Sequence, residues 1–174
     1  MDQLALLFVL LLGAVVSVPV GDRFGLPSPV LMTLLGIVLA VRKEVFVVEQ
    51  GVPQDIEYDA HDADDVHVLA VREDGLPLGT GRLLHGEAAA ARTDGDLTVG
   101  SLGRLAVTQE ARGLGVGAAL VRAIEDAARA RGLAAVDLHA QTHALGFYER
   151  LGYVAYGPEF PDAGMPHRAM RRAL

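Results

Sequence analysis

A glycine-rich segment joins a predicted strand to the longest predicted helix of the chain. The strand covers residues 97–107, the segment is Arg112-Gly113-Leu114-Gly115-Val116-Gly117, and the helix covers 117–131. The N–H groups of a first helical turn have no partner inside the helix, and the helix dipole favours an anion beside them. Glycines let the backbone approach a phosphate closely, and an arginine suits phosphate oxygens. The segment therefore predicts a phosphate-binding turn that opens a helix.

The spacing of the glycines excludes two common classes of phosphate-binding loop. Gly113, Gly115 and Gly117 alternate with other residues, which differs from the G-x-G-x-x-G pattern of dinucleotide-binding folds. The sequence also has no G-K-[ST] that would complete a Walker A loop. Short glycine motifs are weak signals by themselves, so a glycine-rich loop without a chemical role stays open as an alternative.

Hydrophobic periodicity predicts a mixed α/β sheet with flanking helices. Three strands precede the long helix, one strand follows it, and two more strands follow a second helix. A helix therefore crosses between neighbouring parallel strands. The predicted strands are 66–72, 78–84, 97–107, 134–140, 153–156 and 167–172, and the predicted helices are 41–50, 117–131 and 142–151.

Turn and cap residues mark the ends of several predicted helices and strands. Gly132 is predicted to end the long helix, and Thr142 is predicted to cap the start of the next one. Gly79 and Gly81 indicate a bulge or a close backbone approach within their strand. Residues 51–65 are predicted to form a loop, and 86–95 an exposed connection.

Composition excludes several classes of function. The chain has no cysteine, so disulfides, thiolate metal sites and thiol nucleophiles are excluded. Its net charge is −7 and it has no tryptophan, which disfavours a nucleic-acid partner. His139 and His143 are four residues apart, but they flank a predicted strand-to-helix turn and have no H-E-x-x-H carboxylate. We therefore predict no metal site.

The first 41 residues differ in composition from the rest of the chain. Their charged side chains are Asp2, Asp22 and Arg23, and residues 4–20 form an unbroken apolar run. A helix of that length spans about 26 Å, against a hydrocarbon core of about 30 Å, which predicts a short membrane helix. A secretory signal is an alternative, although its basic start is missing. A hydrophobic arm buried in the protein is another.

A second apolar run covers residues 30–41 and is too short to span a membrane alone. It fits a buried or re-entrant helix. Arg42 and Lys43 follow it, and basic residues beside an apolar segment favour the cytoplasmic side. We therefore predict a membrane segment over 1–41 and a cytoplasmic globular domain over 42–174. The protein would then be membrane-associated, and a wholly cytoplasmic protein is the alternative.

Residues 1–40 resemble the opening of bacterial cation:proton antiporters, whose first two membrane helices begin in this way. The other helices are missing from the sequence, and so are the intramembrane acidic residues that would bind ions. We therefore infer no transport function from the resemblance, which implies a fused reading frame whose antiporter-like start serves at most as an anchor.

The rest of the chain resembles another family. The R-G-x-G-x-G turn over 112–117, followed after the next strand by F-Y-E-R-L-G-Y over 147–153, is similar to the GNAT superfamily of acetyl-CoA-dependent N-acetyltransferases. The likeness extends over about residues 40–174. Further segments that resemble one bacterial subgroup are 44–53, 78–83, 138–144 and 164–167, together with Glu57 and Asp59.

The resemblance implies a binding site for acetyl-CoA. The turn would hold the pyrophosphate, and backbone groups of the preceding strand would hold the pantetheine arm and the thioester carbonyl. The splayed parallel strands of the family would be 102–107 and 136–140. The coenzyme-binding residues implied are Leu105, Ala106, Val107, Arg112, Gly113, Leu114, Gly115, Val116, Gly117 and Ala118.

The resemblance also implies transfer of the acetyl group to a primary amine of a small molecule, by direct attack in a ternary complex. Tyr148 matches the general acid of the family, although its position alone equally suits a core residue. Full proton transfer from a tyrosine to a thiolate is uphill by roughly 2 kcal/mol. We therefore expect Tyr148 to stabilise the thiolate by a hydrogen bond.

An amine must lose a proton before it attacks, which requires a base or a water chain. The candidate bases are Glu49, Asp59, His139 and His143, and Glu49 lies in the segment that borders the acceptor site in this family. Each of them equally suits a solvated or satisfied polar residue.

The chain departs from the family pattern at its start. The family begins with a strand and a complete first helix, and here antiporter-like sequence takes their place. We expect the first strand to be missing and only the end of the first helix, about residues 38–50, to remain. The missing elements would expose a sheet edge and apolar surface. A catalytically silent, membrane-held fusion product and a coenzyme-A-binding module are therefore alternative functions, and a homodimer stays open.

Overall fold

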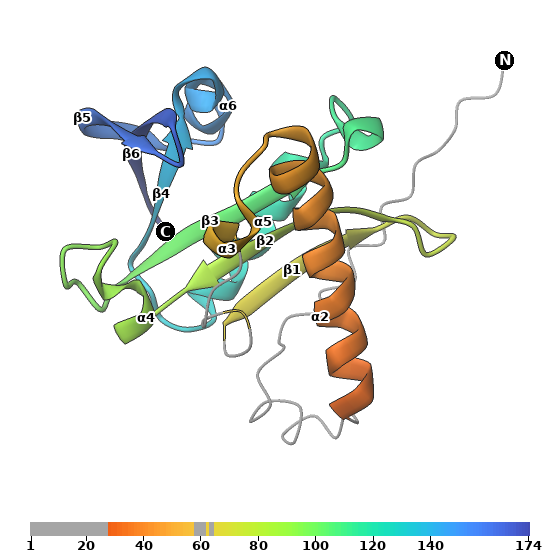
Figure 1. Ribbon diagram of the computed structural model, residues 1–174. Helices are drawn as coiled ribbons and strands as arrows, with labels where there is room; N and C mark the ends of the chain where they lie inside the picture. The colour runs from red at the N-terminus through yellow and green to blue at the C-terminus, as the bar shows by residue number, and fades with distance from the viewer. Residues whose placement is uncertain (1–27, 58–61, 63–64) are drawn as a thin grey trace, which may run out of the picture.

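One six-stranded sheet organises the computed structural model, which describes residues 28–57, 62 and 65–174 (Figure 1). The strand order is β1-β2-β3-β4-β6-β5, and every neighbouring pair is antiparallel except β3 and β4, which are parallel. The predicted mixed sheet is confirmed. The strands are β1 (Val66–Val71), β2 (Pro77–Leu84), β3 (Val99–Val107), β4 (Ala135–Gln141), β5 (Val154–Asp162) and β6 (Met165–Ala173).

The last two strands are longer than predicted. β5 and β6 pair from Val154↔Arg171 to Asp162↔Met165 and form a hairpin, which turns at Ala163 and Gly164. Most of β5 is exposed, so its sequence lacks the apolar alternation by which a half-buried strand is recognised. This hairpin matters for function because its tip reaches the candidate site described below.

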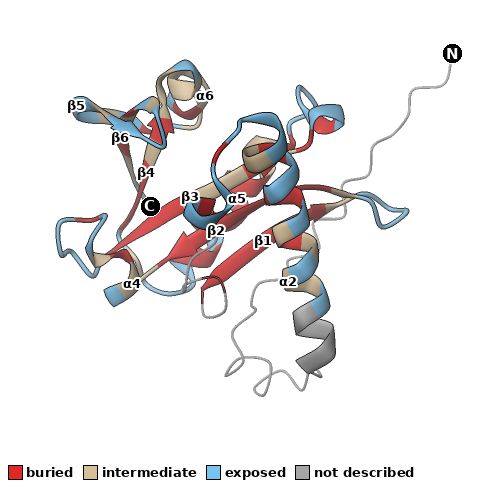
Figure 2. Cartoon of the chain, in the orientation of Figure 1, coloured by how far each residue is buried: buried red, intermediate tan, exposed pale blue. Residues whose placement is uncertain are grey.

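Helices cover both faces of the sheet. Helix α5 (Val116–Arg129) packs on one face and buries Leu120 and Ile124, as its apolar stripe predicted. Helix α2 (Ser28–Arg42) contacts β2 and β3 on the other face, where Val41 packs with Ala106 of β3. Figure 2 shows the strands β1, β2 and β3 buried between these layers.

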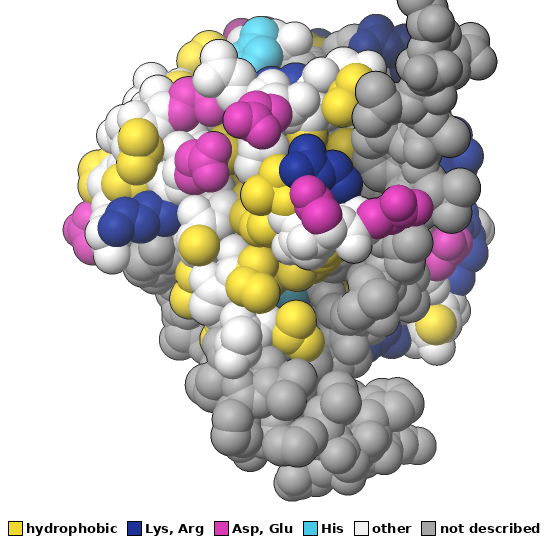
Figure 3. Space-filling view, turned by 90° about the vertical axis from the view of Figure 1, so that its right-hand side faces the viewer, with side chains coloured by type: hydrophobic (Ala, Val, Ile, Leu, Met, Phe, Trp, Pro, Cys, Tyr) yellow, Lys and Arg dark blue, Asp and Glu magenta, His cyan; other side chains and the backbone are white. Residues whose placement is uncertain are grey.

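The first helix is longer than expected. Instead of a remnant over residues 38–50, α2 begins at Ser28, and η1 (Lys43–Glu49) continues it with the wider π-helical turn. Val38, Val41 and Val45 are buried, so the end of the apolar run 30–41 covers the sheet, in line with the buried helix that was one of its two predicted alternatives. Figure 3 shows hydrophobic side chains gathered on this side of the molecule between acidic and basic ones.

The membrane interpretation is not supported within the described chain. None of its helices is both long and apolar enough to cross a membrane, and α2 has 15 residues. The predicted helix over 4–20 lies outside the described residues, so the membrane anchor, the antiporter resemblance and the division at residue 41 stay predictions. Among residues 28–57, 62 and 65 no strand precedes β1, and any earlier strand would also lie outside the described chain.

The environment of Arg42 differs from the prediction that this residue marks the cytoplasmic border of a membrane segment. Its side chain is fully buried, not exposed at a membrane surface. The guanidinium donates to the carboxylate and the backbone oxygen of Glu57, and to Asp62 at 2.5 Å, and Arg82 of β2 donates to the same Asp62 oxygen at 2.7 Å. Because buried charges need partners, this cluster fixes the end of α2 to the sheet. Lys43 beside it is exposed.

Three local predictions change in detail. The predicted loop 51–65 contains one helical turn, α3 (Gln54–Glu57), and the connection 86–95 contains another, α4 (Glu87–Ala90). Thr142 does not cap a helix, because a 3₁₀ turn, η4 (Thr142–Ala144), follows β4 at once and α6 (Leu145–Arg150) begins after it. Gly132 has a φ of +72° and ends α5 as predicted. A further 3₁₀ turn, η3 (Gln109–Ala111), follows β3.

Candidate active site

The two parallel strands part in the middle of the sheet. β3 and β4 pair from Val99↔Ala135 to Leu102↔Leu138, and the pairing ends there although both strands continue. Beyond that point β3 contains a bulge, in which Arg104 and Leu105 lie opposite Gly81 of β2. The strand ends separate because β4 follows β6 along its whole length. The separation opens the sheet at its centre.

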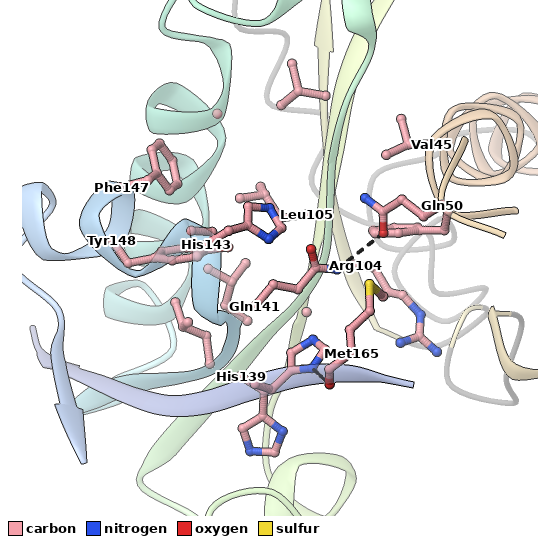
Figure 4. Close-up of a pocket in the computed structure, with 18 of the residues that line it drawn as sticks. Val45, Gln50, Arg104, Leu105, His139, Gln141, His143, Phe147, Tyr148 and Met165 are labelled. Carbon is pink, nitrogen blue, oxygen red and sulfur yellow. Dashed lines mark hydrogen bonds between the residues drawn. The ribbon is translucent and has the colours of Figure 1, made fainter. Parts of the chain in front are cut away.

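A cavity of about 720 Å³ occupies this opening. Gln141 of β4 donates a hydrogen bond of 3.2 Å to Gln50, and this pair crosses the cavity (Figure 4). The pair divides the cavity into two parts. We call the part beside the glycine-rich loop the loop arm, and the part beside the β5–β6 hairpin the hairpin arm. The loop arm is lined by Leu105, Val107, Arg112, Gly115, Gly117, His143, Phe147 and Tyr148, and the hairpin arm by Arg92, Arg104, His139, Asp162, Met165 and His167.

The glycines of the loop arm are required by backbone geometry. Gly113 and Gly115 have φ values of +77° and +84°, a conformation that side chains disfavour. A Cβ at Gly117 would come within 3.3 Å of the Phe147 ring. Gly115 precedes α5, and no side chain caps the first turn of that helix. The first N–H groups of α5 therefore have no side-chain cap, which is compatible with the predicted anion-binding turn.

Arg112 and Glu49 meet at the rim of the loop arm. The arginine donates two hydrogen bonds to the Glu49 carboxylate and one to the backbone oxygen of Val107. The hydrogen bonds from Arg112 hold the pKa of Glu49 below its ordinary value. The predicted coenzyme-binding arginine and one predicted base are therefore each other's partners.

Tyr148 faces the loop arm from α6 and is almost fully buried. Its ring packs edge-to-face on Phe147 and Tyr153, with centroid distances of 4.9 and 5.9 Å. Burial raises the pKa of the Tyr148 phenol above its ordinary value. The hydroxyl therefore stays protonated at neutral pH and is a hydrogen-bond donor there.

The candidate bases lie in different places. His139 lines the hairpin arm from β4, with its ring edge-to-face on Phe160 at 4.8 Å. Burial, and secondarily the charge of Arg92, hold the pKa of His139 below its ordinary value. His143 is exposed at the loop arm, and Asp59 lies outside the described residues.

Arg104 connects the bulge to α3. It has a φ of +53°, and its guanidinium donates to the backbone oxygens of Glu57 and Ile56 at 3.1 and 3.0 Å. It also pairs with the Glu57 carboxylate at 3.1 Å. A left-handed conformation in a non-glycine residue is strained, so these contacts compensate for it and set the bulge against the wall of the hairpin arm.

Comparisons with known proteins agree with this geometry. The family model described as the acetyltransferase (GNAT) domain matches residues 32–174. The chain belongs to the GNAT acetyltransferases. The uncharacterized N-acetyltransferase YjcF of Bacillus subtilis is 38% identical over 133 residues, which cover 76% of this chain and 87% of that protein.

Two crystal structures extend the comparison. An acyl-CoA N-acyltransferase from Pseudomonas aeruginosa has a TM-score of 0.67 and 37% identity, covering 80% of this chain and 89% of its own. The ElaA protein of Escherichia coli also has a TM-score of 0.67, with 31% identity, covering 80% and 90%. The sequence-based prediction of an N-acetyltransferase is thereby confirmed.

Most residues predicted for the site of this acetyltransferase line the cavity. Ala106 and Leu114 do not: Ala106 points to the opposite face of β3, toward Val41 and Val45, and Leu114 is exposed. Strand alternation gives Ala106 the opposite face to its neighbours. The predicted residues that do line the cavity are Glu49, Leu105, Val107, Arg112, Gly113, Gly115, Val116, Gly117, Ala118, His139, His143 and Tyr148.

Sequence reasoning missed other residues of the acetyltransferase cavity, chiefly Gln50, Arg92, Arg104 and Gln141. Gln50 and Gln141 are 91 positions apart, so no local pattern relates them. Arg92 follows an alanine-rich segment that indicated only an exposed connection. The one available signal was the glycine before Arg104, which suggests an irregularity in a strand.

Proposed function

We propose that this acetyltransferase moves an acetyl group from acetyl-CoA to the primary amine of a small molecule by direct attack in a ternary complex. One observation carries the proposal: a single cavity joins the loop arm to the hairpin arm through the gap between β3 and β4. A donor in the first arm and an acceptor in the second can meet without a covalent enzyme intermediate.

The loop arm fits coenzyme A. The N–H groups of the turn and the guanidinium of Arg112 suit a pyrophosphate. The part of β3 that extends beyond its pairing with β4, at Leu105 and Val107, offers backbone groups to a pantetheine arm. Acetyl-CoA would supply a thioester, from which the amine nitrogen takes the acetyl carbon as the carbon–sulfur bond breaks. The bulge leaves backbone groups of β3 outside the sheet ladder, where they can stabilise a developing oxyanion.

We assign His139 as the base. An alkyl amine has a pKa near 10.4 and is protonated at neutral pH. The lowered pKa of His139 keeps its imidazole neutral at pH 7, so that it can accept that proton. Glu49 is the weaker candidate because Arg112 lowers the pKa of its carboxyl and occupies both of its oxygens.

We assign to Tyr148 the stabilisation of the leaving thiolate. Its raised pKa makes proton release unfavourable, so the hydroxyl donates a hydrogen bond to the sulfur and solvent restores the proton balance. The phenol is supported by Phe147 and Tyr153, which limit its movement.

Thermal unfolding of the full chain, with and without acetyl-CoA, tests coenzyme binding. A ligand at a hundred times its dissociation constant adds about 2.7 kcal/mol, which a melting curve resolves. An amine screen read by thiol release tests catalysis, and the absence of cysteine removes background. We expect a higher melting temperature and thiol release with at least one amine. A higher melting temperature without thiol release would instead indicate a coenzyme-A-binding module. An unchanged melting temperature would indicate a silent fusion product.

A further inference from the structure

The hairpin arm contains two ionic side chains that have no hydrogen-bond or ion-pair partner among residues 28–57, 62 and 65–174. Arg104 and Glu57 bind each other there, and on the loop side Arg112 binds Glu49. Arg92 and Asp162 also line the cavity, but the side chain of neither makes a hydrogen bond or an ion pair with any residue that the structure describes. Both are exposed at the mouth of the arm.

Hydrogen bonds within the loop fix the backbone that carries Arg92. The Arg92 amide donates to the backbone oxygen of Ala89 at 2.8 Å. The buried Thr93 hydroxyl bonds to the backbone oxygens of Ala89 and Asp96 at 3.1 and 3.0 Å. The Gly95 amide donates to Ala90 at 2.9 Å. These bonds hold the Arg92 backbone beside the cavity, so a ligand that binds its guanidinium need not order the loop.

Asp162 lines the same cavity from the tip of the β5–β6 hairpin. It ends β5, and its register partner Met165 begins β6. Arg92 lowers the pKa of His139 and Asp162 raises it, so the charges of both reach the imidazole. The proposed base therefore lies within reach of one cation and one anion whose side chains have no partner among the described residues.

This arrangement does not suit a polycation, because Arg92 would repel it. Acidic residues of the predicted loop 51–65 could attract one, but Glu57 and Asp62 are occupied by arginines. A molecule that carries both an ammonium and a carboxylate fits the two free groups. Arginine pairs well with carboxylates because its parallel N–H groups match the two oxygens.

We propose that the acceptor is an amino acid, whose carboxylate binds Arg92 while its amine is directed to His139. Asp162 attracts the ammonium form at the mouth, and His139 takes its proton as the nitrogen approaches the acyl donor. This inference rests on the proposed function and specifies its acceptor.

The test compares related amines on the full chain. Each standard amino acid is assayed beside its amide and beside the amine that lacks the carboxylate, with acetyl-CoA and thiol release as the readout. We expect kcat/KM to be at least tenfold higher for the preferred amino acid than for its two analogues. Arg92→Gln should lower the value for the amino acid at least tenfold, chiefly through KM, and Arg92→Lys should retain part of it.

Arg122→Gln is the matched control, since Arg122 is an exposed arginine on α5 away from the cavity. It should change none of these values. Equal activity on amino acids and analogues, or an Arg92→Gln variant that keeps the amino-acid preference, would overturn the inference and leave the acetyltransferase function intact.

A binding measurement separates the two proposals. Calorimetric titration of amino acids into the protein saturated with coenzyme A requires no turnover. Binding that Arg92→Gln weakens at least tenfold supports the inference even if thiol release is absent, which would count against the proposed function alone. Absence of amino-acid binding to a protein that binds coenzyme A overturns the inference.

Discussion

Arg112 and Glu49 are joined by two parallel hydrogen bonds of 2.6 Å, across 63 positions of sequence. The pair holds the π-helical turn η1 against the glycine-rich loop. A pyrophosphate that binds Arg112 must compete with the Glu49 carboxylate for the same N–H groups. The side chains are 42% and 41% exposed, so solvent screens the pair and the competition is modest.

Glu49→Gln should therefore tighten coenzyme A binding about two- to fivefold, because a neutral amide releases Arg112 more readily. Calorimetric titration measures the change. Pantetheine lacks the pyrophosphate and serves as the matched ligand, whose affinity should be the same for both proteins. Weaker coenzyme A binding, or an equal gain for pantetheine, would show that Glu49 does not compete with the pyrophosphate.

Tyr148→Phe should lower turnover at least tenfold and leave acetyl-CoA affinity nearly unchanged, because the phenol acts on the leaving sulfur and not on the coenzyme's phosphates. Steady-state kinetics and a binding titration measure the two quantities. Tyr156→Phe is the control, since its hydroxyl donates to Asp137 outside the cavity. Wild-type turnover in the Tyr148 variant would remove the phenol from the mechanism.

Protonation of His139 should cause the fall of kcat/KM at low pH, which is the acidic limb of the pH profile. Its pKa lies below the ordinary value of 6.5, and protonation removes the base, so kcat/KM should fall as the pH drops through a midpoint below 6.5. Arg92→Gln should move that midpoint to higher pH, because the guanidinium charge helps to lower the pKa of His139.

His139→Gln should reduce kcat about a hundredfold and abolish the fall of kcat/KM at low pH, whereas His143→Gln should preserve that fall. An unchanged limb in His139→Gln would assign the proton transfer to another group.

Local patterns predicted much of this fold. The apolar stripe of α5 and the glycines before it are each contained within a few neighbouring residues, so periodicity and backbone preference suffice to identify them. The same holds for the glycine-rich loop, whereas Tyr148 was singled out only by the family resemblance. Contacts between distant segments were not predictable in this way: the Glu49–Arg112 pair and the Gln50–Gln141 bridge depend on how the elements are assembled.

The apolar first helix shows a different difficulty. Residues 33–41 are apolar on nearly all sides, which is the pattern both of a membrane helix and of a helix that covers a sheet. The deciding observation is the environment of Arg42 at its end. A basic residue after an apolar run indicates a membrane border only if it is exposed, and its partner Glu57 lies 15 positions away.

Arg42→Met should therefore destabilise the protein by about 3–5 kcal/mol, because the buried Glu57 and Asp62 carboxylates each lose one of the two arginines that pair with them, and keep Arg104 and Arg82 alone. Urea denaturation measures the change. Lys43→Met is the matched control beside it on the chain and should change stability by about 0.5 kcal/mol or less, as its side chain is exposed. Arg42→Lys keeps a cation at this position and should lose less stability than Arg42→Met, which keeps the test informative if Arg42→Met does not fold. Equal, small effects of Arg42→Met and Lys43→Met would contradict the buried cluster and return both residues to the membrane-border interpretation.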